Sequence, residues 1–211
     1  MVARSRLGLT LLCLVVAPLL LAGCSKPKTQ YPPRVDLARF GTLGMIDFSS
    51  PAAEGLGSLA SREFLASLQS AQPGTAVLEL GDEKRALASL GRDTLDLEAI
   101  RTIGEKYRVD ALIVGVLQAE NMQPNISFDS ALSWMTASAE LESGLNVRIL
   151  DSNSGATLWS TAERARAEIA RVDVDGSGVS GIGANPTDDA RLRLVRRLAQ
   201  RATRDFWPYW Q

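Results

Sequence analysis

The sequence predicts one α/β or α+β domain, a two-layer or three-layer sandwich in which helices pack on a mixed, mostly antiparallel sheet. Between residues 43 and 117, short apolar runs alternate with segments of helical period, which is typical of strands followed by helices. Residues 141–161 instead alternate apolar and polar positions on both sides of a turn, as an antiparallel hairpin does. The 188 residues from Cys24 to Gln211 are enough to bury one core, and no internal repeat is visible.

The first predicted strand is the apolar run 43–48, which ends at Ser-Ser-Pro. A helix is expected over 54–71, because its apolar residues recur every three or four positions until Pro73-Gly74. A second strand is expected over 75–80. These elements begin the alternating half of the domain.

Two aspartates mark the helices that follow. Asp82 is expected to cap a short helix that ends at Gly91, and Asp96 is expected to cap the next helix. Residues 109–117 form the most apolar stretch after the leader, so we expect them to be the central strand of the sheet.

The second half begins with the hairpin, whose strands, 141–150 and 156–161, flank the turn 151–155. Residues 164–169 fit both a strand and a helical period, and a strand is favoured. Residues 173–187 are predicted to be a glycine-rich loop. Thr187 is then expected to cap a last helix with Leu194, Val195, Leu198 and Ala202 facing inward.

The N-terminus has the organisation of an export signal. Arg4 and Arg6 precede 7–22, a run without charge that is shorter than the roughly 20 apolar residues a spanning helix needs. The run closes on Leu-Ala-Gly-Cys, which resembles the lipobox of bacterial lipoproteins and implies lipid attachment at Cys24, with palmitate as an acyl chain; the alternative is an ordinary cysteine.

This pattern divides the chain into a removed signal peptide (1–23), a lipidated flexible tether (24–38), and one globular periplasmic domain (39–211). Ser25 follows the cysteine, where enterobacterial lipoproteins retained at the inner membrane carry aspartate. The resemblance therefore implies anchoring at the outer membrane, facing the periplasm.

Composition excludes several function classes. The chain has no histidine, Cys13 leaves with the signal, and Cys24 is consumed by lipid, so we expect no histidine or cysteine chemistry, no disulfide, no metal and no cofactor. Loss of Arg4 and Arg6 takes the formal charge from −1 to −3, which argues against nucleic acid as a partner. A carboxylate-pair enzyme stays conceivable, but a non-enzymatic protein is expected.

The C-terminal region offers candidate partner-binding residues. The last helix carries many arginines, and four aromatic residues occur within 206–210. The candidates are Arg197, Arg201, Arg204, Trp207, Tyr209 and Trp210. The alternatives are a solvated arginine face, aromatic packing against the domain, and aromatic contact with a membrane interface.

Three phrases carry a resemblance to a lipoprotein superfamily: residues 43–48, GEKYRVDALIVGVL at 104–117, and LNVRILDSNSGATLWS at 145–160. It includes the curli secretion channel lipoprotein, the lipoprotein activators of penicillin-binding proteins, and the N-terminal domain of the Tol-system β-propeller protein. The resemblance implies a non-enzymatic protein that binds envelope proteins or assembles with copies of itself.

In the curli channel lipoprotein, two long hairpins per subunit insert into the membrane. The corresponding segments here are 118–140 and 160–187, and the second is too polar and glycine-rich to predict two membrane strands. We therefore expect a lipid-anchored periplasmic interaction module that serves envelope assembly or peptidoglycan-synthesis regulation by binding an unidentified envelope protein. The alternative is a structural subunit of an oligomeric outer-membrane secretion or assembly complex.

Overall fold

The computed structural model describes residues 29–51, 55–118, 120–128, 134–175, 178–184 and 187–210. The chain divides into two compact units. The larger unit is Pro32–Pro208, and the smaller one joins the N-terminal residues up to Tyr31 with the C-terminal residues from Tyr209.

The larger unit is built on a mixed sheet with the strand order β3-β2-β4-β6-β7-β8, to which β5 is added by pairing with β6. β2 pairs in parallel with β3 and β4, and all the other pairings are antiparallel. The strands are β2 (Leu43–Ile46), β3 (Val77–Gly81), β4 (Ala111–Leu117), β5 (Asn121–Phe128), β6 (Trp134–Asp151), β7 (Thr157–Asp175) and β8 (Gly178–Ala184).

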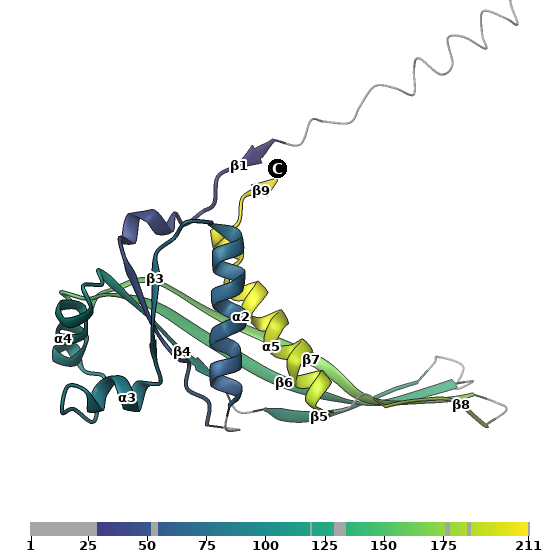
Figure 1. The fold of residues 1–211 in the computed structure, drawn as a ribbon. Coiled ribbons are helices and arrows are strands. Elements are labelled where there is room, and N and C mark those ends of the chain that lie inside the picture. Colours follow the sequence, from purple (N-terminus) through teal and green to yellow (C-terminus); the bar gives the residue numbers. More distant parts are fainter. Residues whose placement is uncertain are drawn as a thin grey trace, which may run out of the picture. The chain divides into compact units, whose positions relative to one another are not determined.

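In the described part of the chain, four α-helices pack on this sheet (Figure 1). They are α2 (Leu56–Ala71), α3 (Glu83–Ala88), α4 (Leu97–Tyr107) and α5 (Thr187–Ala202), and two 3-10 turns, η1 (Leu37–Phe40) and η2 (Arg204–Phe206), accompany them. The predicted fold class, helices packed on a mixed sheet, is confirmed.

Alternation along the strands produces two apolar clusters, one on each side of the sheet. In β4, Ala111 and Ile113 belong to the larger cluster with residues of α2 and α5, whereas Leu112 belongs to the smaller cluster with Ile100 and Ile103 of α4. The β2–β3–β4 end is therefore three layers thick.

The two predicted aspartate caps are confirmed, whereas Thr187, also expected to cap a helix, is itself the first residue of α5. The Asp82 carboxylate accepts a hydrogen bond from the backbone N–H of Arg85 (2.8 Å), and Asp96 accepts one from Ala99 (2.8 Å). Each cap satisfies a backbone donor that the first helical turn leaves without a partner.

The two longer phrases of the resemblance meet at one junction. The Ser152 hydroxyl, in the β6–β7 turn, donates to the carbonyl of Val109 (2.6 Å), and its backbone N–H donates to the carbonyl of Asp110 (3.0 Å). Gly104 of α4 lies so close that a Cβ on it would be 2.5 Å from the Ser152 Cβ. These motif residues hold the end of α4 and the start of β4 against the hairpin turn.

The structure differs from the sequence prediction at 173–187, where a loop is expected. β7 continues to Asp175, and Gly178–Ala184 forms β8, which pairs with β7 from Ala170 onward. The loop prediction is wrong because glycine is unfavourable in strands only on average, and backbone pairing with β7 compensates here.

Packed structure also begins before residue 39, where the globular domain is predicted to start. Leu37 in η1 is fully buried, and the N–H of Val35 donates to the carbonyl of Asp205 (3.1 Å). The larger unit thus includes much of the segment expected to be tether.

In the smaller unit, β1 (Gln30–Tyr31) and β9 (Tyr209–Trp210) form a two-stranded antiparallel ribbon. Across the described residues, no helix combines the length and the apolar character that crossing a membrane requires.

Candidate protein-binding surface

β5–β8 continue the sheet past the first turn of α5 as a four-stranded extension (Figure 1). We call this segment the strand extension; it comprises β5, residues 134–141 of β6, residues 167–175 of β7, and β8. Its root is covered, because Leu141 and Ala167 pack in the larger cluster with Ala190 and Leu194 of α5.

One face of the strand extension is apolar, because directly opposed residues in neighbouring strands share a face. Met122 of β5 pairs with Leu141, which pairs with Ala167, and Ile126 pairs with Ala137, which pairs with Val172 and then Ile182. The apolar face consists of Met122, Pro124, Ile126, Met135, Ala137, Ala139, Leu141, Ala167, Ala170, Val172, Val174, Val179 and Ile182.

The apolar side chains of its two edge strands, β5 and β8, are open to solvent. Ile182 is 77% exposed, Val179 and Met122 are 62% exposed, and Ile126 is 59% exposed. Contiguous apolar surface of this kind on a protein marks an interaction site more often than an isolated exposed leucine does.

The opposite face of the strand extension is polar and internally paired. Arg171 pairs with Asp173 (3.0 Å), and next to the root of the extension Arg166 and Glu142 form an ion pair on the same face (2.8 Å). The Thr136 hydroxyl donates to Asp173 (2.7 Å), and this hydrogen bond, with the nearby Arg171, holds the pKa of the Asp173 carboxyl below its ordinary value.

At the root of the strand extension, Arg191 of α5 donates to Glu120 just before β5 (2.9 Å). This contact and the charge of Glu120 raise the pKa of the Arg191 guanidinium, and Asp188 adds to the effect. The ion pair joins the first turn of α5 to the start of the β5–β6 hairpin.

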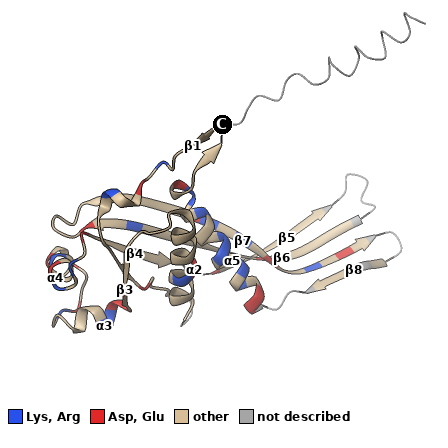
Figure 2. Ribbon diagram, turned by 45° about the horizontal axis from the view of Figure 1, so that its top comes forward, with Lys and Arg blue, Asp and Glu red and all other residues tan. Residues whose placement is uncertain are grey.

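Two of the three predicted arginine candidates lie on α5, where Figure 2 shows basic residues following an acidic first turn, and the third, Arg204, begins η2. Arg197 donates to the carbonyl of Arg166 (2.6 Å), and Arg201 donates to the carbonyl of Arg164. Both carbonyls lie on the part of β7 that β8 does not reach, so the two arginines cover an otherwise open strand edge. Arg204 is exposed.

The aromatic candidates are divided between the two units. Phe206 is fully buried against Trp159, with ring centroids 4.7 Å apart, while Trp207 is 40% exposed in the larger unit. Tyr209 and Trp210 belong to the ribbon of the smaller unit. Cys24 lies outside the described residues.

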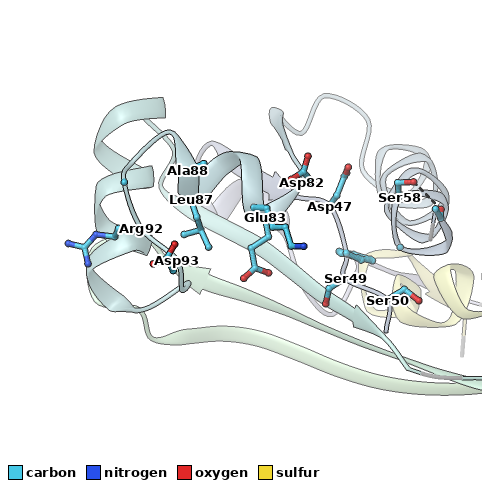
Figure 3. A pocket seen from close by; sticks show the side chains of 15 residues that line it. Asp47, Ser49, Ser50, Ser58, Asp82, Glu83, Leu87, Ala88, Arg92 and Asp93 are labelled. Atoms are coloured by element: carbon cyan, nitrogen blue, oxygen red, sulfur yellow. Dashed lines mark hydrogen bonds between the residues drawn. The ribbon is translucent and has the colours of Figure 1, made fainter. Parts of the chain in front are cut away.

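Sequence reasoning did not find a groove at the carboxyl ends of β2 and β3. Its volume is about 1120 Å³, and it is lined by residues that follow the two strands and by residues of α2 and α3, among them Asp47, Ser49, Ser50, Ser58, Asp82 and Glu83 (Figure 3). Ligands of α/β proteins often bind at this position, because the helices after adjacent parallel strands leave on opposite sides. No motif marks it in the sequence, because the groove depends on β2 and β3 lying side by side.

The groove carries no recognisable catalytic arrangement. Within the described part of the chain, no three histidine, cysteine or acidic residues are grouped so as to hold a metal ion. Arg92 points away from the groove and pairs with Asp96 (3.4 Å). The strand extension is therefore the stronger candidate site.

Comparison with known proteins gives similar structures but no family. No protein-family model and no curated protein sequence matches the chain. Similar solved structures include the PelC dodecamer from Paraburkholderia phytofirmans (13% identity, TM-score 0.42, covering 82% of this chain and 94% of that one). Lipoprotein GNA1162 from Neisseria meningitidis matches with 14% identity and a TM-score of 0.39, covering 60% of this chain and 83% of that one.

The C-terminal domain of LpoB from Salmonella enterica is also similar, with 10% identity and a TM-score of 0.35, covering 59% of this chain and 82% of that one. At these identities and TM-scores, no function transfers to this chain. The resemblance to the curli and Tol-system proteins stays a prediction.

Proposed function

We propose that this chain is a lipid-anchored, non-enzymatic protein of the bacterial envelope that binds another envelope protein through the apolar face of its strand extension. The anchor is the lipid on Cys24, and Ser25 favours the outer membrane over the inner one. The observation that carries the binding role is the exposure of Met122, Ile126, Val179 and Ile182 on one continuous sheet face.

The physical reason is that exposing these aliphatic side chains to water costs free energy, which burial against a partner would recover. Burying a valine or isoleucine side chain contributes roughly 1.5–3 kcal/mol relative to leaving it in water. Several such side chains on a stiff sheet can provide the central, desolvated part of an interface, while the ion pairs of the opposite face stay hydrated. The partner is thus a protein that presents an apolar surface of its own.

A non-enzymatic role is supported by composition. The full sequence contains no histidine, and its cysteines are one in the leader and one in the lipobox. Histidine, the most common general base, is therefore missing from the mature chain, and the lipidated cysteine is not available as a nucleophile.

The binding role is tested in cells with a photo-crosslinking residue placed on either face of β5 and on the apolar face of β8. Ile126 and Ile182 are the positions on the apolar face, and Asn125 and Gln123, on the polar face of β5, are matched controls for Ile126. We expect a discrete protein adduct from the apolar positions and none from the controls. No adduct from Ile126 or Ile182, or equal adducts from both faces, would refute the proposal.

The anchor is tested separately. Cells grown with labelled palmitate should yield labelled protein, and Cys24→Ser should remove the label and leave the leader uncut. Unlabelled wild-type protein would refute the lipid anchor, whatever the crosslinking shows.

A structural subunit of an oligomeric complex is the second candidate function. The observation that favours it is the outer edge of β5 and the outer edge of β8, neither of which has a further strand partner among the described residues. Open edges can pair between copies of a chain. If the chain forms such an oligomer, crosslinking from Ile182 should join two copies, so the adduct should have twice the mass of the chain. Light scattering in mild detergent should then show a discrete oligomer.

A further inference from the structure

The ribbon of the smaller unit concentrates aromatic side chains. Gln30 is opposite Trp210, and Tyr31 is opposite Tyr209. The tyrosine rings stack with centroids 5.4 Å apart and planes inclined by 16°. Because successive side chains of a strand point to opposite faces, the tyrosine pair occupies one face of the ribbon and Trp210 the other.

This ribbon leaves much of its aromatic surface in water. Trp210 is 60% exposed and Tyr31 is 39% exposed. Isolated two-stranded ribbons are marginally stable at best in water, and this one has two residue pairs. An additional surface that covers the rings would stabilise it.

The short stretch of chain between Cys24 and the ribbon limits where the surface that covers the rings can be. Gln30 follows Cys24 by six residues, and a chain spans at most about 3.6 Å per residue, so the ribbon lies within about 20 Å of the lipidated residue. Lys26 and Lys28 fall between the two, and lysine is attracted to anionic headgroups. The lipid therefore keeps the ribbon within reach of the membrane surface.

We infer that Tyr31, Tyr209 and Trp210 insert into the headgroup region of the membrane that holds the lipid on Cys24. Tyrosine and tryptophan are the side chains enriched at this depth, because each combines an apolar ring with a polar group. The ribbon is then a second membrane contact beside the acyl chains. The inference rests on the proposed lipid anchor.

The test uses the full-length, lipidated protein in vesicles of phosphatidylethanolamine and phosphatidylglycerol that contain lipids brominated near the headgroup. Bromine quenches tryptophan fluorescence on contact, and the chain has four tryptophans. We compare wild-type protein with Trp210→Phe and with Trp207→Phe, a matched control because Trp207 is also exposed but belongs to the larger unit. The acyl chains on each protein are counted by intact mass.

We expect Trp210→Phe to lose most of the quenching that wild-type protein shows and Trp207→Phe to retain it. Acylated protein whose quenching is the same in wild type and Trp210→Phe, or is lost with Trp207→Phe instead, overturns the ribbon contact and leaves the anchor intact. Protein without acyl chains overturns the anchor and the ribbon contact together.

Discussion

Replacing Gly104 by alanine should destabilise the domain through one contact at the junction of α4 with the β6–β7 turn. The new Cβ would lie 2.5 Å from the Ser152 Cβ, against about 3.5–4.0 Å for an ordinary carbon contact. Both carbons are bonded directly to the backbone, so neither can rotate away. Ser152 itself is 3% exposed, which leaves little room for the turn to move.

The magnitude follows from two opposing effects. Overpacking a core costs typically 1–3 kcal/mol, and we take about 3 kcal/mol because the overlap is severe. Alanine gains about 1 kcal/mol over glycine within a helix. Gly104→Ala should therefore lower the free energy of unfolding by about 2 kcal/mol, the difference between these effects.

A double-mutant cycle isolates the contact. In a Ser152→Gly background the overlap is gone, so Gly104→Ala should raise the free energy of unfolding by about 1 kcal/mol, giving a coupling of about 3 kcal/mol. Ser152→Ala is the matched control, because it removes the hydroxyl but keeps the Cβ and should leave the cost of Gly104→Ala unchanged. Equilibrium urea unfolding of the chain from Ser25 onward, without leader and lipid, measures all the variants. Equal relief by Ser152→Ala and Ser152→Gly, or additive effects, would refute the reasoning.

Three further predictions concern the C-terminal packing, pH and the strand extension. Phe206→Ala should cost about 3–5 kcal/mol in urea unfolding, since the ring is fully buried against Trp159, and a loss below about 1 kcal/mol would contradict the burial. The Ser154 hydroxyl and backbone N–H hold the pKa of Asp151 below its ordinary value, so this carboxylate stabilises the fold above about pH 4 and loses that effect as the pH falls through its folded-state pKa. The thermal midpoint of Ser154→Ala should thus approach that of wild type on acidification, and a gap that does not change with pH would show that Asp151 is not the cause. Ile182→Thr should change the free energy of unfolding by less than about 0.5 kcal/mol, because the side chain is 77% exposed. The same substitution should weaken crosslinking from Ile126. Undiminished crosslinking would show that Ile182 is not part of the interface.

The first half of the fold could be predicted because local signals and tertiary packing agree there. Asp82 and Asp96 cap the helices that the sequence indicates, and the apolar run 109–117 contains β4, which lies between β2 and β6. Helical period, capping residue and turn residue each depend on a few neighbouring positions, so one sequence is enough to find them.

The strand extension could be predicted only in part, because two irregularities break its alternation. Ile169 of β7 has no partner in β6, since Ala139 pairs with Ala170 and Glu140 with Glu168. Such a bulge changes which face the following residues point to, so the regular alternation of 164–169 does not continue into 170–174. β5 was missed because it contains Pro124, which is tolerated at a sheet edge but argues against a strand when its neighbours are unknown.

The sequence predicts the candidate site less well than it predicts the strand extension. Charge marks Arg197 and Arg201 in the sequence, but the open carbonyls of β7 that they cover depend on where β8 begins. The apolar face was missed for the same reason, since it combines residues of four strands and no single segment contains enough of them to stand out.

The two bulges also argue that the apolar face is a maintained feature of the fold. If Ile169 took a regular place in the ladder instead of bulging out of it, alternation from Ala167 would turn Ala170, Val172 and Val174 to the polar face. A second irregularity, between the pairs Asp173–Gly181 and Val174–Val179, keeps Val179 on the same face as Ile182. Each bulge weakens local pairing, and both keep aliphatic side chains on a face that is open to solvent at β5 and β8. A solvent-exposed surface gains nothing from such an arrangement, whereas a surface that a partner covers gains the burial of every aligned side chain.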